Sequence, residues 1–290
     1  MRAKERCSLE QTKALLRRFD LRAKKGLGQH FLVDDGVLGT IIEAAELSPN
    51  DLVVEVGPGL GILTEALAKR AEKVIAIEVD SKLASALSQS LSHLSNLSII
   101  NADVLQVELR ELGVANLGYK VVANLPYYIA APVLRHFLES PVKPQRMVIT
   151  VQKEVAQSIA AAPGKMSILS IAVQLYGKPT IVAYVPARSF YPAPKVDSAI
   201  LSIDVYEQPI AEVEDVARFF HLVRAGFSAP RKQLRNALGS GLSLPPESAA
   251  ALLNRAQISP KRRAETLTIE EWTQLYHATE GQYADPPCLC

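Results

Sequence analysis

The sequence contains few of the residues that mark secreted, disulfide-bonded or metal-binding proteins. Its 290 residues include only three cysteines, Cys7, Cys288 and Cys290, and all three lie next to the chain ends. Such a pattern excludes a disulfide framework and favours a reducing cytoplasm. Because the two C-terminal cysteines have no histidine or second cysteine pair nearby, we expect no metal site.

Long apolar runs and a strong excess of charge are also missing. No apolar run reaches the roughly 18 residues that a membrane span needs, so we expect no membrane segment. The net charge is only +2, so nucleic-acid binding has to rest on local basic clusters. Residues 1–23 are basic and lack the apolar stretch of a secretory signal. We predict a basic N-terminal arm there, either a short helix or a loose segment that faces RNA.

The clearest motif is a strand that runs into a glycine turn and then a helix. Residues 52–56 have the length and β-branched content of a buried strand, and helical spacing resumes over 62–68. Between them stand Gly57, Gly59 and Gly61. Glycines let the backbone turn tightly and approach a ligand closely, and the following helix begins with unpaired N–H groups. This pattern predicts a nucleotide site.

The glycine spacing alone does not identify the nucleotide. A dinucleotide fold favours G-x-G-x-x-G, whereas this turn reads G-x-G-x-G. Glu55 stands two residues before the first glycine, where a carboxylate would meet a cationic group of the ligand. A sulfonium nucleoside such as S-adenosylmethionine therefore fits better than a pyrophosphate. An ordinary glycine-rich turn is the alternative.

Two acidic residues follow at the ends of the next strands. The second strand, 73–79, contains Glu78, which comes 21 residues after Gly57. This is close to the ~20 residues that separate such a turn from a carboxylate that binds ribose hydroxyls. The third strand, 97–100, runs into Asp103, where the amine of adenine would lie. Since ligands of open α/β sheets bind outside the carboxyl ends of strands, the set favours an adenine nucleoside.

The fourth strand, 119–123, ends in the sequence Asn124-Leu125-Pro126-Tyr127. An asparagine oxygen and the backbone carbonyl before a proline can both accept hydrogen bonds from one NH2 group. The tyrosine ring offers a stacking face for an unpaired base. Two acceptors would favour a pyramidal nitrogen aligned for attack on a methyl group, which needs orientation and no strong base. The pattern indicates amine methylation; a turn with core aromatics is the alternative.

These motifs together resemble the bacterial small-subunit rRNA adenine dimethyltransferases. The resemblance runs from about Lys24 to Tyr276 and implies S-adenosylmethionine as cofactor. It implies dimethylation of the N6 amines of two adjacent adenines near the 3′ end of 16S rRNA, within a pre-30S particle, during ribosome biogenesis. The motifs that carry it, in chain order, are 28–32 (GQHFL), 55–61 (EVGPGLG), 124–127 (NLPY) and 190–199 (FYPAPKVDSA).

The resemblance also assigns roles to individual residues and implies no metal. Catalytic residues would form the pocket of the target adenine, with one ring stacking from the far side; these are Asn124, Leu125, Pro126, Tyr127 and Phe190. Cofactor-binding residues would be His30 and Leu32 on the methionine side, Gly57 at the methionine, Glu78 at the ribose, Asp103 at the adenine, and Asn124.

Two positions depart from the family pattern. Tyr128 replaces the asparagine that usually follows the motif tyrosine, which would change the polarity of the pocket. Segment 163–167 is shorter than the family's loop, so we expect one RNA-facing loop to be trimmed.

The predicted elements give an α/β fold with seven strands and helices between the first five, a Rossmann-like methyltransferase sheet. Beyond Gln208-Pro209 the chain reads as helical only. We expect an S-adenosylmethionine-dependent methyltransferase domain over 24–208, a small all-helical rRNA-binding domain over 209–280, and a disordered tail over 281–290. The predicted strands are 52–56, 73–79, 97–100, 119–123, 146–152, 180–185 and 198–205, and Ser81 is expected to cap a helix over 81–93.

Basic residues cluster in the helical part. No acidic residue occurs between Phe219 and Arg235. Because the run follows an inferred RNA-base pocket, we predict contacts with rRNA phosphates. The clusters are Arg224, Arg231, Lys232 and Arg235, and then Lys261, Arg262 and Arg263.

Three other functions compete with this interpretation. A resistance-type methylase of large-subunit rRNA shares the pocket but usually has isoleucine where this chain has Leu125. A non-catalytic assembly factor on the same fold is disfavoured by the intact 124–127 motif. A nicotinamide oxidoreductase is disfavoured by the glycine spacing. We expect a cytoplasmic monomer.

Overall fold

The computed structural model describes residues 8–279, which divide into two compact units. The first unit comprises 8–157 and 177–207, and the second comprises 158–176 and 208–279. The predicted tail and the three cysteines lie outside the described residues. The division differs from the predicted domain boundary, because residues 158–176 belong to the same unit as the C-terminal helices.

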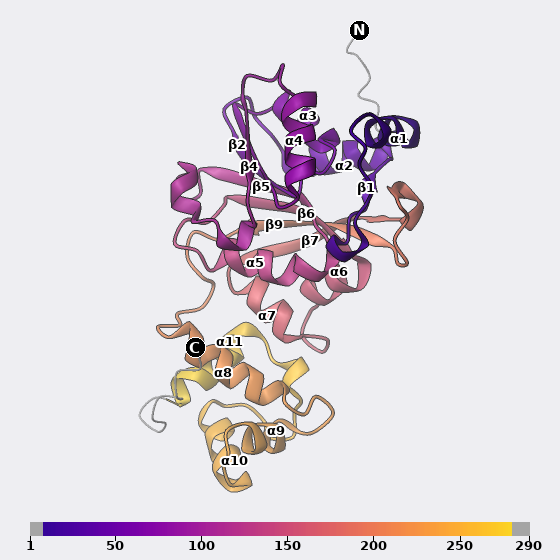
Figure 1. The fold of residues 1–290 in the computed structure, drawn as a ribbon. Coiled ribbons are helices and arrows are strands. Elements are labelled where there is room, and N and C mark those ends of the chain that lie inside the picture. The colour runs from indigo at the N-terminus through magenta and orange to yellow at the C-terminus, as the bar shows by residue number, and fades with distance from the viewer. Residues whose placement is uncertain (1–7, 280–290) are drawn as a thin grey trace. The chain divides into compact units, whose positions relative to one another are not determined.

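A seven-stranded sheet forms the centre of the first unit (Figure 1). Its strand order is β4-β3-β2-β5-β6-β9-β7. The first five strands are parallel, and β9 runs antiparallel between β6 and β7. This confirms the predicted seven strands. The order reverses at β2, so the carboxyl ends of β2 and β5 flank a crevice of the kind that binds ligands. The strands are β2 (Leu52–Val56), β3 (Lys73–Glu78), β4 (Leu97–Asn101), β5 (Tyr119–Asn124), β6 (Arg146–Gln152), β7 (Gly177–Val185) and β9 (Ser198–Val205).

Helices cover both faces of this sheet. On one face, Ile41 of α2 (Asp35–Ala45) and Leu67 of α3 (Ile62–Ala68) share an apolar core with Val122 of β5. On the other, the Tyr119 ring of β5 packs 6.5 Å from the Phe137 ring of α5 (Ala130–Leu138). Residues 119 and 122 point to opposite faces because side chains alternate along a strand. Helix α6 (Lys153–Ile159) follows β6.

Helix α4 (Ser81–Ser90) begins with a different cap from the one predicted. Asp80 is the N-cap, and its carboxylate accepts a hydrogen bond from the Lys82 N–H at 3.1 Å. Ser81 is the first helical residue, which corrects the prediction of a serine cap. A carboxylate satisfies the free N–H groups of the first turn as well as a hydroxyl does.

The N-terminal segment folds onto the same unit. Helix α1 (Leu9–Arg18) is capped by Ser8, whose side chain accepts a hydrogen bond from the Gln11 N–H. A two-stranded antiparallel sheet pairs β1 (Phe31–Leu32) with β8 (Phe190–Tyr191). Strands of two residues carry no periodicity, so the sequence did not predict this pair. It brings the 28–32 motif against the 190–199 motif.

The second unit is a bundle of helices. Trp272 is fully buried, and a Cβ on Gly226 would lie 2.4 Å from its ring, so this glycine makes room for the tryptophan. The N–H groups of Gly164 and Met166 donate to the Glu265 carbonyl at 2.8 and 3.1 Å, which explains why 158–176 belongs here. The helices are α7 (Ile168–Gln174), α8 (Val216–Phe227), α9 (Leu234–Gly241), α10 (Pro246–Arg255) and α11 (Ile269–Ala278).

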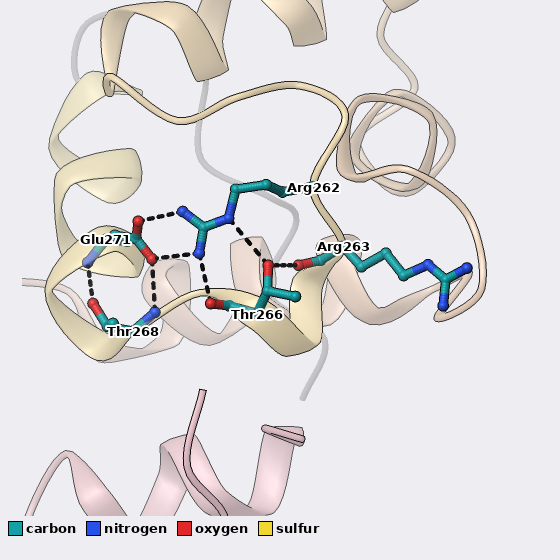
Figure 2. A network of polar contacts seen from close by, with 5 residues as sticks. All are labelled: Arg262, Arg263, Thr266, Thr268 and Glu271. Atoms are coloured by element: carbon teal, nitrogen blue, oxygen red, sulfur yellow. Dashed lines mark hydrogen bonds and ion pairs between the residues drawn. The ribbon is translucent and has the colours of Figure 1, made fainter. Parts of the chain in front are cut away.

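One ion pair fixes the start of α11 (Figure 2). The Arg262 guanidinium bonds both carboxylate oxygens of Glu271 and also the carbonyl of Thr266. The same carboxylate accepts the Thr268 N–H at 2.9 Å, and Thr268 accepts the Glu271 N–H at 3.2 Å, forming a capping box. The Arg262 guanidinium is thus engaged within the unit while 32% of the side chain stays exposed, so its predicted phosphate contact remains a prediction. Its neighbours Lys261 and Arg263 are exposed.

We expect Glu271→Ala to destabilise the second unit by about 1–3 kcal/mol, because it removes the cap and the ion pair together. Glu270→Ala, at an exposed position of the same helical turn, is the matched control and should cost less than about 0.5 kcal/mol. The guanidinium of Arg262 lowers the pKa of Glu271, so the stabilisation is present above the ordinary glutamate pKa and is lost as pH falls through the lowered value. Urea unfolding at neutral and acid pH measures both effects. Equal losses of stability in the two variants would contradict the assignment.

Candidate active site

A cavity of about 430 Å³ opens at the carboxyl ends of β2, β3 and β5. This volume lies within the range of small-molecule sites, roughly 300–1,000 Å³. All the residues that the sequence nominated for the cofactor and for the target base line this one cavity. They are His30, Leu32, Gly57, Glu78, Asp103, Asn124, Leu125, Pro126, Tyr127 and Phe190.

The glycine turn forms one wall of the cavity. All three glycines have positive φ, and Gly59 and Gly61 are also packed closely. A Cβ on Gly59 would lie 3.2 Å from the Phe31 ring, and a Cβ on Gly61 would lie 2.4 Å from Leu87 Cδ1. A side chain at either position would strain the backbone, and at Gly61 it would also clash with Leu87. The turn can therefore bring bare backbone to the cavity.

Glu78 is buried at the end of β3 and held by two backbone groups. One carboxylate oxygen accepts the Gly59 N–H at 3.1 Å, and the other accepts the Asp80 N–H at 2.9 Å. Burial raises the pKa of this carboxyl, although the two N–H bonds oppose the rise. A carboxylate with fixed orientation retains lone pairs that can bind two neighbouring hydroxyls.

Asp103 follows β4 and is exposed at the cavity. One of its carboxylate oxygens caps a short 3-10 helix, Val104–Gln106, by accepting the Leu105 N–H at 3.0 Å. This cap fixes the side chain. The sequence indicated the acid at this strand end but not the cap that orients it.

Asn124, the last residue of β5, has its side-chain amide oriented by the loop opposite. Its Nδ2 donates to the His30 carbonyl at 3.0 Å, which leaves Oδ1 as an acceptor. His30 is itself fixed, because Nδ1 donates to the Pro192 carbonyl at 2.6 Å. The His30 and Tyr127 rings stack with centroids 6.0 Å apart, and the Tyr127 hydroxyl lies 2.8 Å from the Ser198 hydroxyl. Acceptor and aromatic faces thus converge at one end of the cavity.

The apolar residues near Asn124 are buried, whereas Tyr128, which departs from the family pattern, is exposed. Phe190 and Leu125 are 4% and 3% exposed, and Phe190 is paired with Leu32 through the β1–β8 sheet. Tyr128, by contrast, is 60% exposed. The unusual tyrosine lies at the cavity surface, where its ring adds apolar area without entering the core.

Asp80 does not line the cavity but contacts residues that do, and the sequence motifs assigned it no role. It is 5% exposed, and its carboxylate pairs with Lys24 at 2.8 Å and accepts from Gln29 Nε2 at 3.3 Å. Gln29 Oε1 in turn accepts the Lys24 N–H at 2.8 Å. These bonds hold the 24–32 loop over the cavity as a lid. No local pattern in the sequence indicates these contacts, because Asp80 lies close to Lys24 and Gln29 only in the folded chain.

Glu55 also lines the cavity but differs from the expected carboxylate. It is 1% exposed, and its Oε2 has no hydrogen-bond partner among the described residues. Burial raises the pKa of Glu55 to about 8, the Glu78 carboxylate adds to the rise, and the nearby Thr64 hydroxyl only partly opposes it. The side chain is therefore mostly protonated at neutral pH in this structure.

This proton makes stability depend on pH. From about pH 5 to pH 8 the folded protein keeps a proton on Glu55 that the unfolded chain has released, so stability falls as pH rises. We expect Glu55→Gln to flatten the slope by up to about 1.4 kcal/mol per pH unit. Urea unfolding across this range measures it, with the exposed Glu43→Gln as a control that should follow the parent. The same slope in all three proteins would refute the assignment.

Neither a cluster of metal-ligating side chains nor a helix able to span a membrane occurs among the described residues. Between residues 8 and 279, no three or more His, Cys, Asp or Glu side chains are placed to hold a metal ion. Over the same residues, no helix has the length and apolar character needed to cross a bilayer.

Named proteins of two organisms are similar to this chain over nearly its whole length. "Ribosomal RNA small subunit methyltransferase A" of Dehalococcoides mccartyi is 49% identical over 280 residues, covering 97% of this chain and 95% of the relative. The protein of that name from Alkaliphilus metalliredigens is 43% identical over 274 residues, covering 92% and 96%.

Two solved structures are also similar to this chain. A dimethyladenosine transferase from Plasmodium falciparum superposes with a TM-score of 0.72 at 26% identity, covering 85% of this chain and 96% of that one. The 23S rRNA methyltransferase ErmE gives 0.68 at 29% identity, covering 86% and 98%. The predicted Rossmann-like methyltransferase fold is confirmed. A sequence profile described as "Ribosomal RNA adenine dimethylase" matches residues 20–280. The chain belongs to the ribosomal RNA adenine dimethylase family.

Proposed function

We propose that this protein uses S-adenosylmethionine to dimethylate the N6 amines of two adjacent adenines near the 3′ end of 16S rRNA. It would act in the cytoplasm, on a pre-30S particle, during ribosome biogenesis. The observation that carries this proposal is the amide of Asn124, which is fixed by the His30 carbonyl and belongs to a residue that lines the same cavity as Glu78. An acceptor suited to an amine and a buried carboxylate suited to ribose hydroxyls thus line the same cavity.

The glycine-turn side of the cavity fits the cofactor. Glu78 would bind the ribose, Asp103 the adenine amine, and Gly57 the methionine part, with His30 and Leu32 closing that side. S-adenosylmethionine, when bound, supplies an electrophilic methyl group. Glu55 would then face a cationic ligand, which favours its ionised form and offsets the cost of its burial. The orphaned Oε2 of Glu55 supports a polar or cationic occupant.

The β5 side of the cavity fits the target base. The oxygen of Asn124 and the carbonyl of Leu125 would accept the two hydrogens of the adenine amine, and Pro126 keeps the chain extended at that carbonyl. Tyr127 and Phe190 would hold the base between aromatic faces. Held in this way, the amine nitrogen would be oriented toward the methyl group that the cofactor supplies, and the surplus proton of the methylated amine would pass to solvent. Orientation supplies most of the rate gain.

The choice of the small-subunit substrate rests on the relatives. Chains of 40–49% identity carry the small-subunit name, whereas the 23S rRNA methyltransferase is 29% identical. Leu125 in the motif agrees with this choice. A non-catalytic role on the same fold is disfavoured because the acceptors and both aromatic residues line the cavity together.

The second unit would contact rRNA phosphates. The Leu234 N–H donates to the Arg262 carbonyl at 2.6 Å, and the Arg235 N–H donates to the Pro260 carbonyl at 3.3 Å. These bonds place the two basic loops side by side, a juxtaposition that the sequence did not indicate. The exposed cations available there are Arg231, Lys232, Arg235, Lys261 and Arg263, with Arg224 on α8. We further propose that the protein acts as a monomer without a metal.

One experiment tests the function directly. Incubate the protein with methyl-labelled S-adenosylmethionine and with small or large ribosomal subunits from cells that lack these methylations, and then map the labelled bases. We expect two labelled adjacent adenines near the 3′ end of 16S rRNA and none in the large subunit. Label in the large subunit alone would support the resistance-type activity instead.

Two substitutions should separate binding from chemistry. Glu78→Ala removes a charged acceptor and should weaken S-adenosylmethionine binding about ten- to hundredfold by calorimetry, equivalent to ~1.5–3 kcal/mol. Asn124→Ala should lower kcat on the order of 100-fold while leaving subunit affinity close to that of the parent. Thermal unfolding provides the control for folding. Wild-type turnover in Asn124→Ala would place the amine elsewhere.

A further inference from the structure

Helix α1 packs behind one wall of the active-site cavity. Leu16 is 8% exposed and packs in one cluster with Phe31, Leu60 and Leu83. All three of these partners also line the cavity. The loose arm that the sequence allowed is therefore, from Leu9 to Arg18, a helix whose apolar side is packed against the first unit.

The outer side of α1 is basic. Lys13, Arg17 and Arg18 are exposed, and Arg22 follows just beyond the helix. Within the described part of the chain, none of these four cations has an acidic partner. Lys24, in contrast, is held by Asp80. The only acids among residues 8–24 are Glu10 and Asp20, so this short segment carries a local excess of positive charge.

This charge lies next to the end of the cavity that fits the target base. The Lys13 ammonium lies 5.4 Å from the centroid of the Tyr191 ring. Tyr191 pairs with Phe31 in the β1–β8 sheet and directly follows Phe190, which lines the cavity. Lys13 is thus placed beside the aromatic wall of the cavity, and Arg17 and Arg18 follow it at exposed positions of the same helix.

We infer that Lys13, Arg17 and Arg18 bind the phosphates of the RNA strand that flank the adenine inserted in the cavity. This inference rests on the proposed function. A base that leaves its stack to enter a pocket keeps its own 5′ and 3′ phosphates at the entrance, and such contacts set position without reading sequence. An anionic membrane is a poorer fit, because the apolar side that would insert into lipid is already buried against the cavity wall.

The test is a salt titration of binding to unmethylated small subunits. The variant is Lys13→Gln, Arg17→Gln and Arg18→Gln together. The matched control removes three exposed lysines at the opposite, amino-terminal edge of the strands: Lys69→Gln, Lys73→Gln and Lys178→Gln. For the α1 variant we expect about ten- to hundredfold weaker subunit binding near physiological salt. Its log–log salt slope should be smaller by up to about 0.7–0.9 for each phosphate that is no longer bound.

The other readouts separate a phosphate contact from a structural brace. Calorimetric S-adenosylmethionine affinity and thermal stability should match the parent, and kcat at saturating subunits should be retained while KM rises. The same affinity and slope as the parent, or an equal weakening in the control, would overturn the inference. Loss of binding to phosphatidylserine vesicles in place of subunits would overturn it in favour of a membrane contact. If the parent itself fails to methylate small subunits, the proposed function fails instead.

Discussion

The hydrogen bond from Asn124 to the His30 carbonyl is the interaction on which the site depends most. It joins the end of a central strand to the loop that covers the cavity, and it fixes the amide so that its oxygen remains available. Without the covering loop, an asparagine at a strand end would rotate freely and bind water. The β1–β8 pair completes the frame, because it fixes Leu32 against Phe190.

A second chain of contacts links the lid to the opposite side of the cavity. The backbone of Asp80 donates to Glu78, while its side chain holds Lys24 and Gln29. Burying the Asp80 carboxylate is compensated by a nearby cation and by its place at the start of α4, and these contacts keep its pKa below the ordinary value. Asp80 thus couples the proposed ribose site to the 24–32 loop that covers the cavity.

The described cations of this protein fall into two groups, those paired with acids and those left exposed, and the net charge does not distinguish them. Some cations are paired with acids of the same chain, as Lys24 and Arg262 are, and these acidic partners are partly or largely shielded from solvent. Others remain exposed on α1 and on the paired loops of the second unit. Glu55 and Glu78 are buried carboxyls with raised pKa values, and the positive charge of an incoming cofactor would favour their ionised forms.

The sequence by itself determined the elements whose signals are local. β2, β6 and β9 have the predicted bounds because strand periodicity and turn residues act within a few positions, and the spacing from Gly57 to Glu78 placed both at one cavity. Tertiary structure decided the rest. The two-residue strands, the Asp80 cap with its lid contacts, the grouping of 158–176 and the internal role of Arg262 all depend on segments far apart in sequence. Which side chain reaches which partner is set by packing in three dimensions, and no local pattern records it.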